Sequence, residues 1–308
     1  MDYWPHSGLE DDLRPRMAEA MARGRPFALV TVHDADGGPR GVGAQMVVTD
    51  DDYWGFVSGG CIEADVAIHG RETLRDGAPR HLVYGKGSPW IDTRLPCGGR
   101  LDLLVERIEP DDAAITAFVA AHKARRRVRY RTNGSERECS ADPTSGGQWV
   151  VDHLYRPVQR LIVFGSDPIA LAIAGLAGQL GWSSAIVWPH GPEAAPFANV
   201  VHRSDAPASA LAALAPDPDT AIAVATHDQD YDEQAMVAAL ATETSFIGVL
   251  GSRRRIPDRI ARLRALGVTD EQLARLRMPI GLPLGSRSPW EVAVSVTAQV
   301  IAERRLEP

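Results

Sequence analysis

Short apolar runs separated by polar, glycine-containing turns fill the first 110 residues or so. These runs are rich in β-branched and aromatic residues, which predicts strands, and they span residues 27–32, 44–49, 53–57, 81–84 and 101–105. After the third run, Ile62, Val66 and Leu74 recur at helical spacing, and Gly77 suits the end of a helix. We therefore predict a sheet with one helix packed on it, closing near Pro110.

The middle of the chain has a different pattern. Residues 111–122 predict a helix, residues 123–131 alternate basic with other side chains, and Asn133-Gly134 is a turn signal. We interpret the basic run as a solvated edge strand, where charge discourages association between sheets, and not as an RNA or partner site. Cys139 follows in a polar stretch without a motif and is interpreted as an incidental surface cysteine.

From residue 160 onward, predicted strands and helices alternate. Residues 160–165 resemble a buried parallel strand, and further strands are predicted at 185–188, 200–201, 221–226 and 246–250. Helices are predicted through Gly181 and at 209–214 and 232–241. Two capping boxes mark later helices, Thr269 with Gln272 and Ser288 with Glu291.

These patterns together predict an α/β protein. We expect an N-terminal mixed α+β domain at residues 1–110, a connector with the basic edge strand at 111–157, and a Rossmann-like doubly wound parallel-sheet domain at 158–308. A chain of 308 residues is long enough for two cores of ordinary size.

Composition and charge exclude several classes of function. A hydrophobic fraction of 44% is typical of a globular protein, and the net charge of -7 argues against a nucleic-acid or membrane-surface binder, which would carry a basic excess. No apolar stretch reaches the length of a membrane span, and no secretory signal is visible at the N-terminus. Because three cysteines without close spacing fit a reducing compartment, we expect a cytoplasmic protein. From its charge we expect no nucleic-acid or membrane partner.

Two glycine-flanked cysteines are the most informative features of the chain. Cys61 follows Gly59-Gly60 and enters the first predicted helix, and Cys97 precedes Gly98-Gly99. At the first turn of a helix, a thiol would meet unpaired backbone N–H groups and the positive end of the macrodipole, which favour the thiolate. A thiolate binds soft metals or attacks sulfur, whereas each cysteine alone is also consistent with a small buried hydrophobe. Zinc is disfavoured because no Cys-x-x-Cys or histidine ligand spacing is present.

Glu63 lies in the first turn of the helix that follows Cys61. Its simplest role is to complement the helix dipole, and the alternative is that it orients a ligand or the thiol.

The Rossmann-like half carries polar residues where its predicted strands end. Ligands bind such sheets at the carboxyl ends of the strands, near the point where the strand order reverses. The segments expected there are residues 165–168, 188–190, 226–228 and 251–255. Arg253 and Arg254 could hold a phosphate with the help of helix N-terminal amides. His227 is either a ligand-site residue or a capping or core histidine.

The sequence disfavours an ordinary dinucleotide site. In the fingerprint Gly-x-Gly-x-x-Gly, Asp167 occupies the second glycine position, where its carboxylate would repel a pyrophosphate. Trp188 replaces the acidic residue expected after the second strand. We therefore expect a Rossmann-type scaffold with another use.

In their order and spacing, these motifs resemble the XdhC/CoxI family of molybdenum-cofactor-binding maturation chaperones. The resemblance covers most of the chain and rests on residues 28–32, 43–46, 58–63, 95–99, 226–228, 246–254, 279–285 and 289–295. There is one departure, because family members usually carry a Gly-Ala-Gly-His turn after the first Rossmann strand and an aspartate after the second. This chain has Gly165-Ser166-Asp167-Pro168 and Trp188-Pro189-His190 instead.

The resemblance implies a chaperone that binds molybdenum cofactor (molybdopterin) as cargo, protects it during sulfuration and inserts it into an apo molybdenum hydroxylase such as xanthine dehydrogenase. A cysteine desulfurase would be the second partner, and a homodimer is the expected assembly. The cargo is a pterin with a phosphate and a dithiolene-bound molybdenum, so Cys61 and Cys97 would be soft donors toward the metal. The implied cofactor-binding residues are Gly59, Gly60, Cys61, Glu63, Cys97, Gly98, Gly99, His227, Arg253 and Arg254.

Two other classes of function stay open. As an enzyme, the chain would be a NAD(P)-dependent oxidoreductase or a sulfurtransferase that carries a persulfide on Cys61. As a scaffold, it would dock on a molybdenum enzyme without holding cofactor. We favour the chaperone, which needs no catalytic residues, over both.

Overall fold

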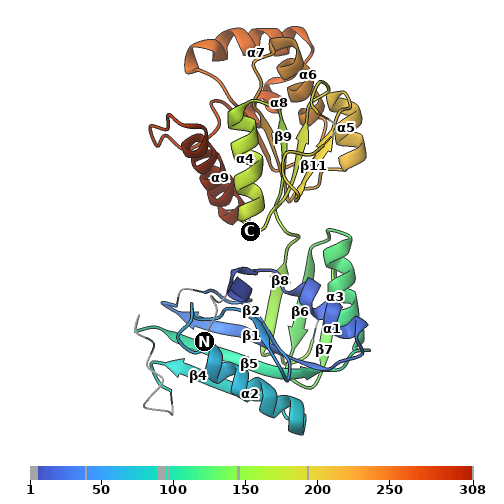
Figure 1. Ribbon diagram of the computed structural model, residues 1–308, viewed down its shortest axis with the longest axis vertical. Coiled ribbons are helices and arrows are strands. Elements are labelled where there is room, and N and C mark those ends of the chain that lie inside the picture. The colour runs from blue at the N-terminus through green and yellow to red at the C-terminus, as the bar shows by residue number, and fades with distance from the viewer. Residues whose placement is uncertain are drawn as a thin grey trace. The chain divides into compact units, whose positions relative to one another are not determined.

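The chain folds into two compact units. The computed structural model describes residues 6–38, 40–88, 95, 98–143, 146–192 and 194–306. Its two units are Met1–Pro157 and Val158–Pro308, each with its own sheets (Figure 1). Each unit also has its own apolar cores. No helix within the described ranges is long and apolar enough to cross a membrane.

The first unit is built on a five-stranded antiparallel sheet of order β3-β2-β1-β5-β4. Its strands are β1 (Phe27–Asp36), β2 (Gln45–Val48), β3 (Tyr53–Gly55), β4 (Arg80–Gly85) and β5 (Arg100–Ile108). Alternate residues of β1 belong to different cores, because Phe27 and Leu29 enter one apolar cluster and Ala28 and Val30 another. The predicted strands of this sheet are present. Because two apolar clusters lie on opposite sides of β1, both faces of the sheet are covered.

Different layers cover these two faces. On one face lies α2 (Glu63–Asp76), which ends as predicted at Gly77 in the left-handed conformation. On the other face lie α1 (Arg14–Ala22) and α3 (Ala113–Lys123), together with a second, smaller sheet. The short 3-10 helix η1 (His6–Leu9) precedes α1.

The smaller sheet shows that the prediction of a basic edge strand was wrong. Its order is β7-β6-β8, with β6 (Val128–Thr132) in the centre between β7 (Arg137–Ser140) and β8 (Val151–Tyr155). The buried side chains of β6 alternate with arginines, and Arg129 pairs with Asp152 of β8 at 2.7 Å. The partner strands come from polar segments without clear alternation, so the sequence did not reveal that β6 is paired on both sides.

Residues 111–157 therefore fold as part of the first unit. Cys139, on β7, is not a surface residue, because it is half-buried and packs against the apolar cluster between the two sheets.

The second unit contains a six-stranded sheet of order β11-β10-β9-β12-β13-β14, in which every pairing is parallel. The strands are β9 (Arg160–Phe164), β10 (Ser183–Val187), β11 (Val200–Arg203), β12 (Thr220–Val224), β13 (Phe246–Val249) and β14 (Leu276–Arg277). This is the Rossmann strand order. The strands before β12 are added on one side of β9 and the later strands on its other side, so the strand order reverses between β9 and β12. The predicted fold class is confirmed.

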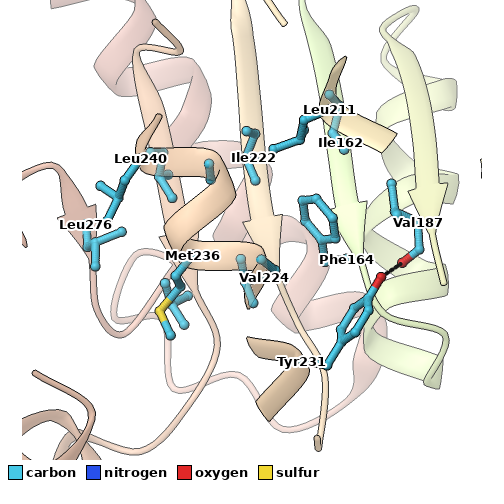
Figure 2. Packing of buried hydrophobic residues seen from close by; sticks show 14 of the residues in the cluster. Ile162, Phe164, Val187, Leu211, Ile222, Val224, Tyr231, Met236, Leu240 and Leu276 are labelled. Carbon is cyan, nitrogen blue, oxygen red and sulfur yellow. Dashed lines mark hydrogen bonds between the residues drawn. The ribbon is translucent and has the colours of Figure 1, made fainter. Parts of the chain in front are cut away.

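Helices cover both faces of this sheet. They are α4 (Pro168–Gln179), α5 (Pro207–Leu214), α6 (Gln229–Leu240), α7 (Ile256–Ala265), α8 (Asp270–Ala274) and α9 (Pro289–Leu306), with the 3-10 helix η2 (Arg253–Arg255) before α7. α4 and α9 lie side by side on one face. α5, α6 and α7 pack on the other face, where Met236 and Tyr231 of α6 lie against Val224 and Phe164 (Figure 2). The predicted capping box of Thr269 and Gln272 is confirmed at α8.

Candidate functional site

The carboxylate of Glu63 is the centre of the loop that carries Cys61. The Glu63 side chain is only 2% exposed, and Ser58 donates its hydroxyl to it at 2.8 Å. Five backbone N–H groups also donate to this carboxylate at 2.7 to 3.2 Å, from Val57, Ser58, Gly59, Gly60 and Ile62. The loop is thus folded around a buried anion that belongs to the chain itself.

Glycine makes this wrapping possible. Gly59 and Gly60 have φ values of 91° and 107°, in the region that other residues rarely adopt. Burial on its own would raise the pKa of Glu63, but the hydrogen bonds from Ser58 and Val57 outweigh it and hold this pKa below its usual value. The carboxylate therefore stays ionised and fixes the loop.

Cys61 is exposed at the outer side of this loop, and its thiol forms no disulfide. Its N–H donates to the hydroxyl oxygen of Ser58 at 3.0 Å, and α2 begins only at Glu63. The expectation that the thiol meets unpaired helix N–H groups was wrong, because Glu63 and Ser58 already accept the hydrogen bonds of the loop. The loop, held by these hydrogen bonds, presents the thiol of Cys61 to solvent.

Ser58 is the residue of this loop that sequence reasoning missed. Its hydroxyl oxygen also accepts the N–H of Ile62 at 3.2 Å. It precedes the acid by five residues, which is not the spacing of a capping box. Only the three-dimensional fold brings the two side chains together.

The second cysteine motif lies partly outside the described residues, and Cys97 is among those outside. Gly99 lies so close to the backbone of Asp36 and Gly37 that a Cβ at this position would be 2.7 Å from the Asp36 carbonyl oxygen. Gly98 has a left-handed φ of 72°. Leu95 is buried in the same apolar cluster as Val57 and Ile62, so the two cysteine-bearing loops are anchored on one core.

A cavity of about 580 Å³ opens in the second unit. Its lining residues are Ser166, Asp167, Trp188, Thr226, His227, Asp228 and Gln229. These residues follow β9, β10 and β12, so the cavity lies at the carboxyl ends of the strands, where the strand order reverses. Three of the four segments expected in the crevice meet here.

Asp167 and His227 face one another in this cavity. Asp167 is the N-cap of α4 and accepts the N–H of Ala170 at 2.8 Å through Oδ1. Nε2 of His227 lies 2.9 Å from Oδ2 of Asp167, yet this buried oxygen accepts no hydrogen bond from any part of the chain that the structure describes. The proximity makes an ion pair when the imidazole is protonated, without an aligned N–H···O bond.

The arginine pair lies at the end of β13, the strand next to β12. Arg253 and Arg254 are exposed, and neither guanidinium has an ion-pair partner among the described residues. Ser252 caps their turn by accepting the N–H of Arg254 at 3.2 Å. These two arginines are outside the lining of the cavity, so the structure does not bring them into direct contact with His227.

A buried ion pair ties the loop after β12 to the loop after β13. Arg259 of α7 donates to Asp232 of α6 at 2.9 Å and to the carbonyl oxygen of Leu250 at 3.2 Å. The other carboxylate oxygen of Asp232 accepts the hydroxyl of Thr226 at 2.6 Å. This chain of contacts holds the cavity wall and the arginine turn in a fixed relation.

No group of three or more histidine, cysteine, aspartate or glutamate side chains forms a metal site within the described ranges.

Comparison with known families gives two matches. Residues 20–85 match the family model described as "XdhC and CoxI family", and residues 161–300 match that described as "XdhC Rossmann domain". Between them they contain the loop of Cys61, the cavity and the arginine turn.

Individual proteins are also similar. The chain is 34% identical over 307 residues to the molybdenum cofactor insertion chaperone PaoD of Escherichia coli, covering 96% of this chain and 90% of that one. It is 25% identical to the uncharacterized protein YqeB of Escherichia coli, of which it covers 44%. A crystal structure described as a xanthine dehydrogenase from Bacillus halodurans shares the fold, with a TM-score of 0.75, 24% identity and 96% coverage of both chains.

Proposed function

The chain belongs to the XdhC and CoxI family, and from this premise we propose that it is a molybdenum cofactor chaperone. It binds the cofactor as cargo, protects it during sulfuration and inserts it into an apo molybdenum hydroxylase such as xanthine dehydrogenase. The observation that carries this proposal is the 34% identity to a molybdenum cofactor insertion chaperone over 96% of the chain.

The loop of Cys61 suits such a cargo. Thiolates are soft ligands, and the molybdenum of this cofactor is itself held by dithiolene sulfur. Cys61 is exposed on a loop that Glu63 fixes, so a thiol stands ready without rearrangement of the backbone. We propose that Cys61, with Cys97, contacts the metal end of the cofactor, and that Gly59, Gly60, Gly98 and Gly99 let the backbone approach it. Glu63 acts through the loop as a positioning residue, since its carboxylate is occupied by the loop's own N–H groups.

The arginine turn suits the anionic part of the cargo. Two guanidinium groups without ion-pair partners among the described residues are suited to bind a phosphate, because the arginine fork matches phosphate oxygens. We propose Arg253 and Arg254 as the phosphate contacts, and the neighbouring cavity, which His227 lines, as the place of the rest of the ligand.

The partners follow from this role. An insertion chaperone must dock on an apo molybdenum hydroxylase, and sulfuration of the cofactor calls for a cysteine desulfurase as the sulfur donor. We propose that the protein is not itself an enzyme, that it works in the cytoplasm and that it forms a homodimer.

The test is anaerobic binding of purified molybdenum cofactor to the full chain, followed by measurement of retained molybdenum and pterin. We expect saturable binding that Cys61→Ala together with Cys97→Ala weakens at least about tenfold, because charge-assisted and metal–thiolate contacts are lost. The matched control is Cys139→Ala, which alters a thiol packed against the core of the first unit. Absence of saturable binding, or equal binding by the double variant and the control, would contradict the proposal.

The arginine pair is tested in the same assay. Arg253→Ala with Arg254→Ala should weaken cofactor binding about tenfold or more, since hydrogen bonds to a charged phosphate are lost. Arg264→Ala is the control, because Arg264 is an exposed arginine of α7 in the same unit. Equal effects of the two changes would remove the arginine turn from the site.

The exposure of Cys61 also favours a second role, that of a persulfide carrier. In this step the Cys61 thiolate attacks the terminal sulfur of a desulfurase persulfide, a new S–S bond forms on Cys61, and the desulfurase cysteine leaves as a thiolate. Mass spectrometry after incubation with a desulfurase and cysteine should find one added sulfur atom on the Cys61 peptide. If Cys61 stays unmodified, the persulfide-carrier role is contradicted and only the chaperone role remains.

A further inference from the structure

We propose that the cavity in the second unit recognises the aminopyrimidinone edge of a pterin, with Asp167 as the acceptor of its adjacent N–H groups and Trp188 as the surface on which the ring stacks. This inference rests on the proposed function, because it names which part of the cofactor this cavity takes. A pterin presents a ring N–H beside an exocyclic amino group, and a carboxylate with two parallel acceptor oxygens matches that edge.

Asp167 has the acceptor capacity that this contact needs. A carboxylate offers about four lone-pair directions. The N–H of Ala170 occupies one of them, on Oδ1, and Oδ2 accepts no hydrogen bond within the described chain. The Asp167 side chain is only 15% exposed, and a buried acceptor left without a donor is unfavourable. A ligand that supplies N–H donors would satisfy it.

In the absence of a ligand, His227 occupies the position that those donors would take. Its Nε2 lies 2.9 Å from Oδ2 of Asp167, but its side chain is 81% exposed. An exposed imidazole can turn into solvent with little loss of packing, so the ligand N–H groups can take its position at the carboxylate. His227 therefore covers the acceptor before the ligand arrives and does not form part of the recognition itself.

Trp188 supplies the apolar wall of the cavity. Its two described aromatic neighbours, Tyr231 and His190, meet it at 75° and 84°, so neither ring lies flat on the indole. Trp188 packs against both apolar clusters of this unit and also lines the cavity. We place the pteridine ring against the part of the indole that lines the cavity, because heteroaromatic bases stack on aromatic side chains. The position where a dinucleotide-binding protein has a ribose-binding acid thus carries a stacking surface.

The same residues select against other ligands. The Asp167 carboxylate caps α4, so a pyrophosphate cannot use that helix N-terminus without repulsion. Adenine and cytosine present an amino group beside a ring nitrogen acceptor, which would face the carboxylate unfavourably. Guanine shares the donor pair of pterin, so the cavity should tolerate guanosine better than adenosine or cytidine.

The experiment is fluorescence titration of the full chain with neopterin, an uncharged pterin without metal or phosphate, up to roughly millimolar concentration. The comparison ligand is 6,7-dimethyllumazine, a pteridine in which an oxo group replaces the amino group. We expect saturable neopterin binding, at least about tenfold weaker binding of the lumazine, and a similar loss with Asp167→Asn. Asparagine is a good N-cap, so this change removes the charge and keeps the helix start.

Three further variants separate recognition from folding. Trp188→Phe should retain most of the binding and Trp188→Leu should lose it, whereas His227→Ala should keep or strengthen it. The inference is overturned if the wild type shows no saturable binding, if the lumazine binds equally well, or if Asp167→Asn binds neopterin like the wild type. If intact cofactor still binds while neopterin does not, the chaperone proposal stands and only the assignment of this cavity fails.

Discussion

Nε2 of His227 lies 2.9 Å from Oδ2 of Asp167, across the point where the parallel sheet reverses its strand order. Dinucleotide-binding proteins use this point, and the helix that begins there, to hold a pyrophosphate. In this chain an aspartate and a histidine occupy it, so the Rossmann scaffold has been kept while its usual anion site is closed by a side chain.

The closed anion site leads to a prediction about nicotinamide cofactors. NAD and NADP at about 1 mM should leave the Tm of the full chain unchanged, because a ligand that does not bind the native state cannot stabilise it. Differential scanning fluorimetry measures this directly. A Tm that rises with NAD concentration would contradict it and would revive the oxidoreductase alternative.

The two described thiols should differ in reactivity. Burial raises the pKa of Cys139 to about 11, which lowers its thiolate fraction near neutral pH by roughly two orders of magnitude relative to a free cysteine. Cys61 is exposed, so we expect iodoacetamide to modify its peptide far faster than that of Cys139 in the native protein. Mass spectrometry of a labelling time course follows each peptide, and unfolding in denaturant should abolish the difference. Equal rates in the native protein would mean that the loop does not present Cys61 as described.

Replacing Glu63 by glutamine should destabilise the first unit. Glutamine has the same shape, but its amide nitrogen would face backbone N–H donors and leave some of them unpaired. We expect a loss of about 2–3 kcal/mol in the free energy of unfolding, measured by urea denaturation. Glu109→Gln, at an exposed carboxylate of the same unit, should change it by less than about 0.5 kcal/mol. Similar losses of unfolding free energy for both changes would contradict the role of the buried Glu63 carboxylate in holding the loop.

The same carboxylate predicts a dependence on pH. The pKa of Glu63 is lower in the folded chain than its ordinary value of about 4.3. Its contribution to stability is therefore fully present above that ordinary value and is lost as the pH falls through the lower, folded pKa. Other carboxyls titrate in the same direction. An example is Asp12, whose pKa is lowered, despite its burial, by hydrogen bonds from Arg14 and by the nearby imidazole of His122. The quantity to measure is the difference in unfolding free energy between wild type and Glu63→Gln. It should shrink as the pH falls below about 4.3. A difference that stays constant with pH would contradict the assignment.

The sequence by itself determined the fold class of this protein. Continuous apolar runs such as residues 160–165 predict parallel strands because such strands are buried on both faces, and Gly77 and Thr269 mark helix ends through local backbone geometry and capping. The order and spacing of the motifs also indicated the family. All of these signals are local, or repeat with a short period, so a linear reading can recover them.

Only the tertiary structure decided which groups meet. The basic strand β6 became central because two weakly patterned polar segments pair with it. Glu63 proved to be an acceptor for its own loop, and Asp167 came to lie against His227, which follows it by sixty residues. Hydrogen bonds and ion pairs depend on positions within a few tenths of an ångström, whether the partners share one loop or lie far apart in the chain. Periodicity carries no information about such distances.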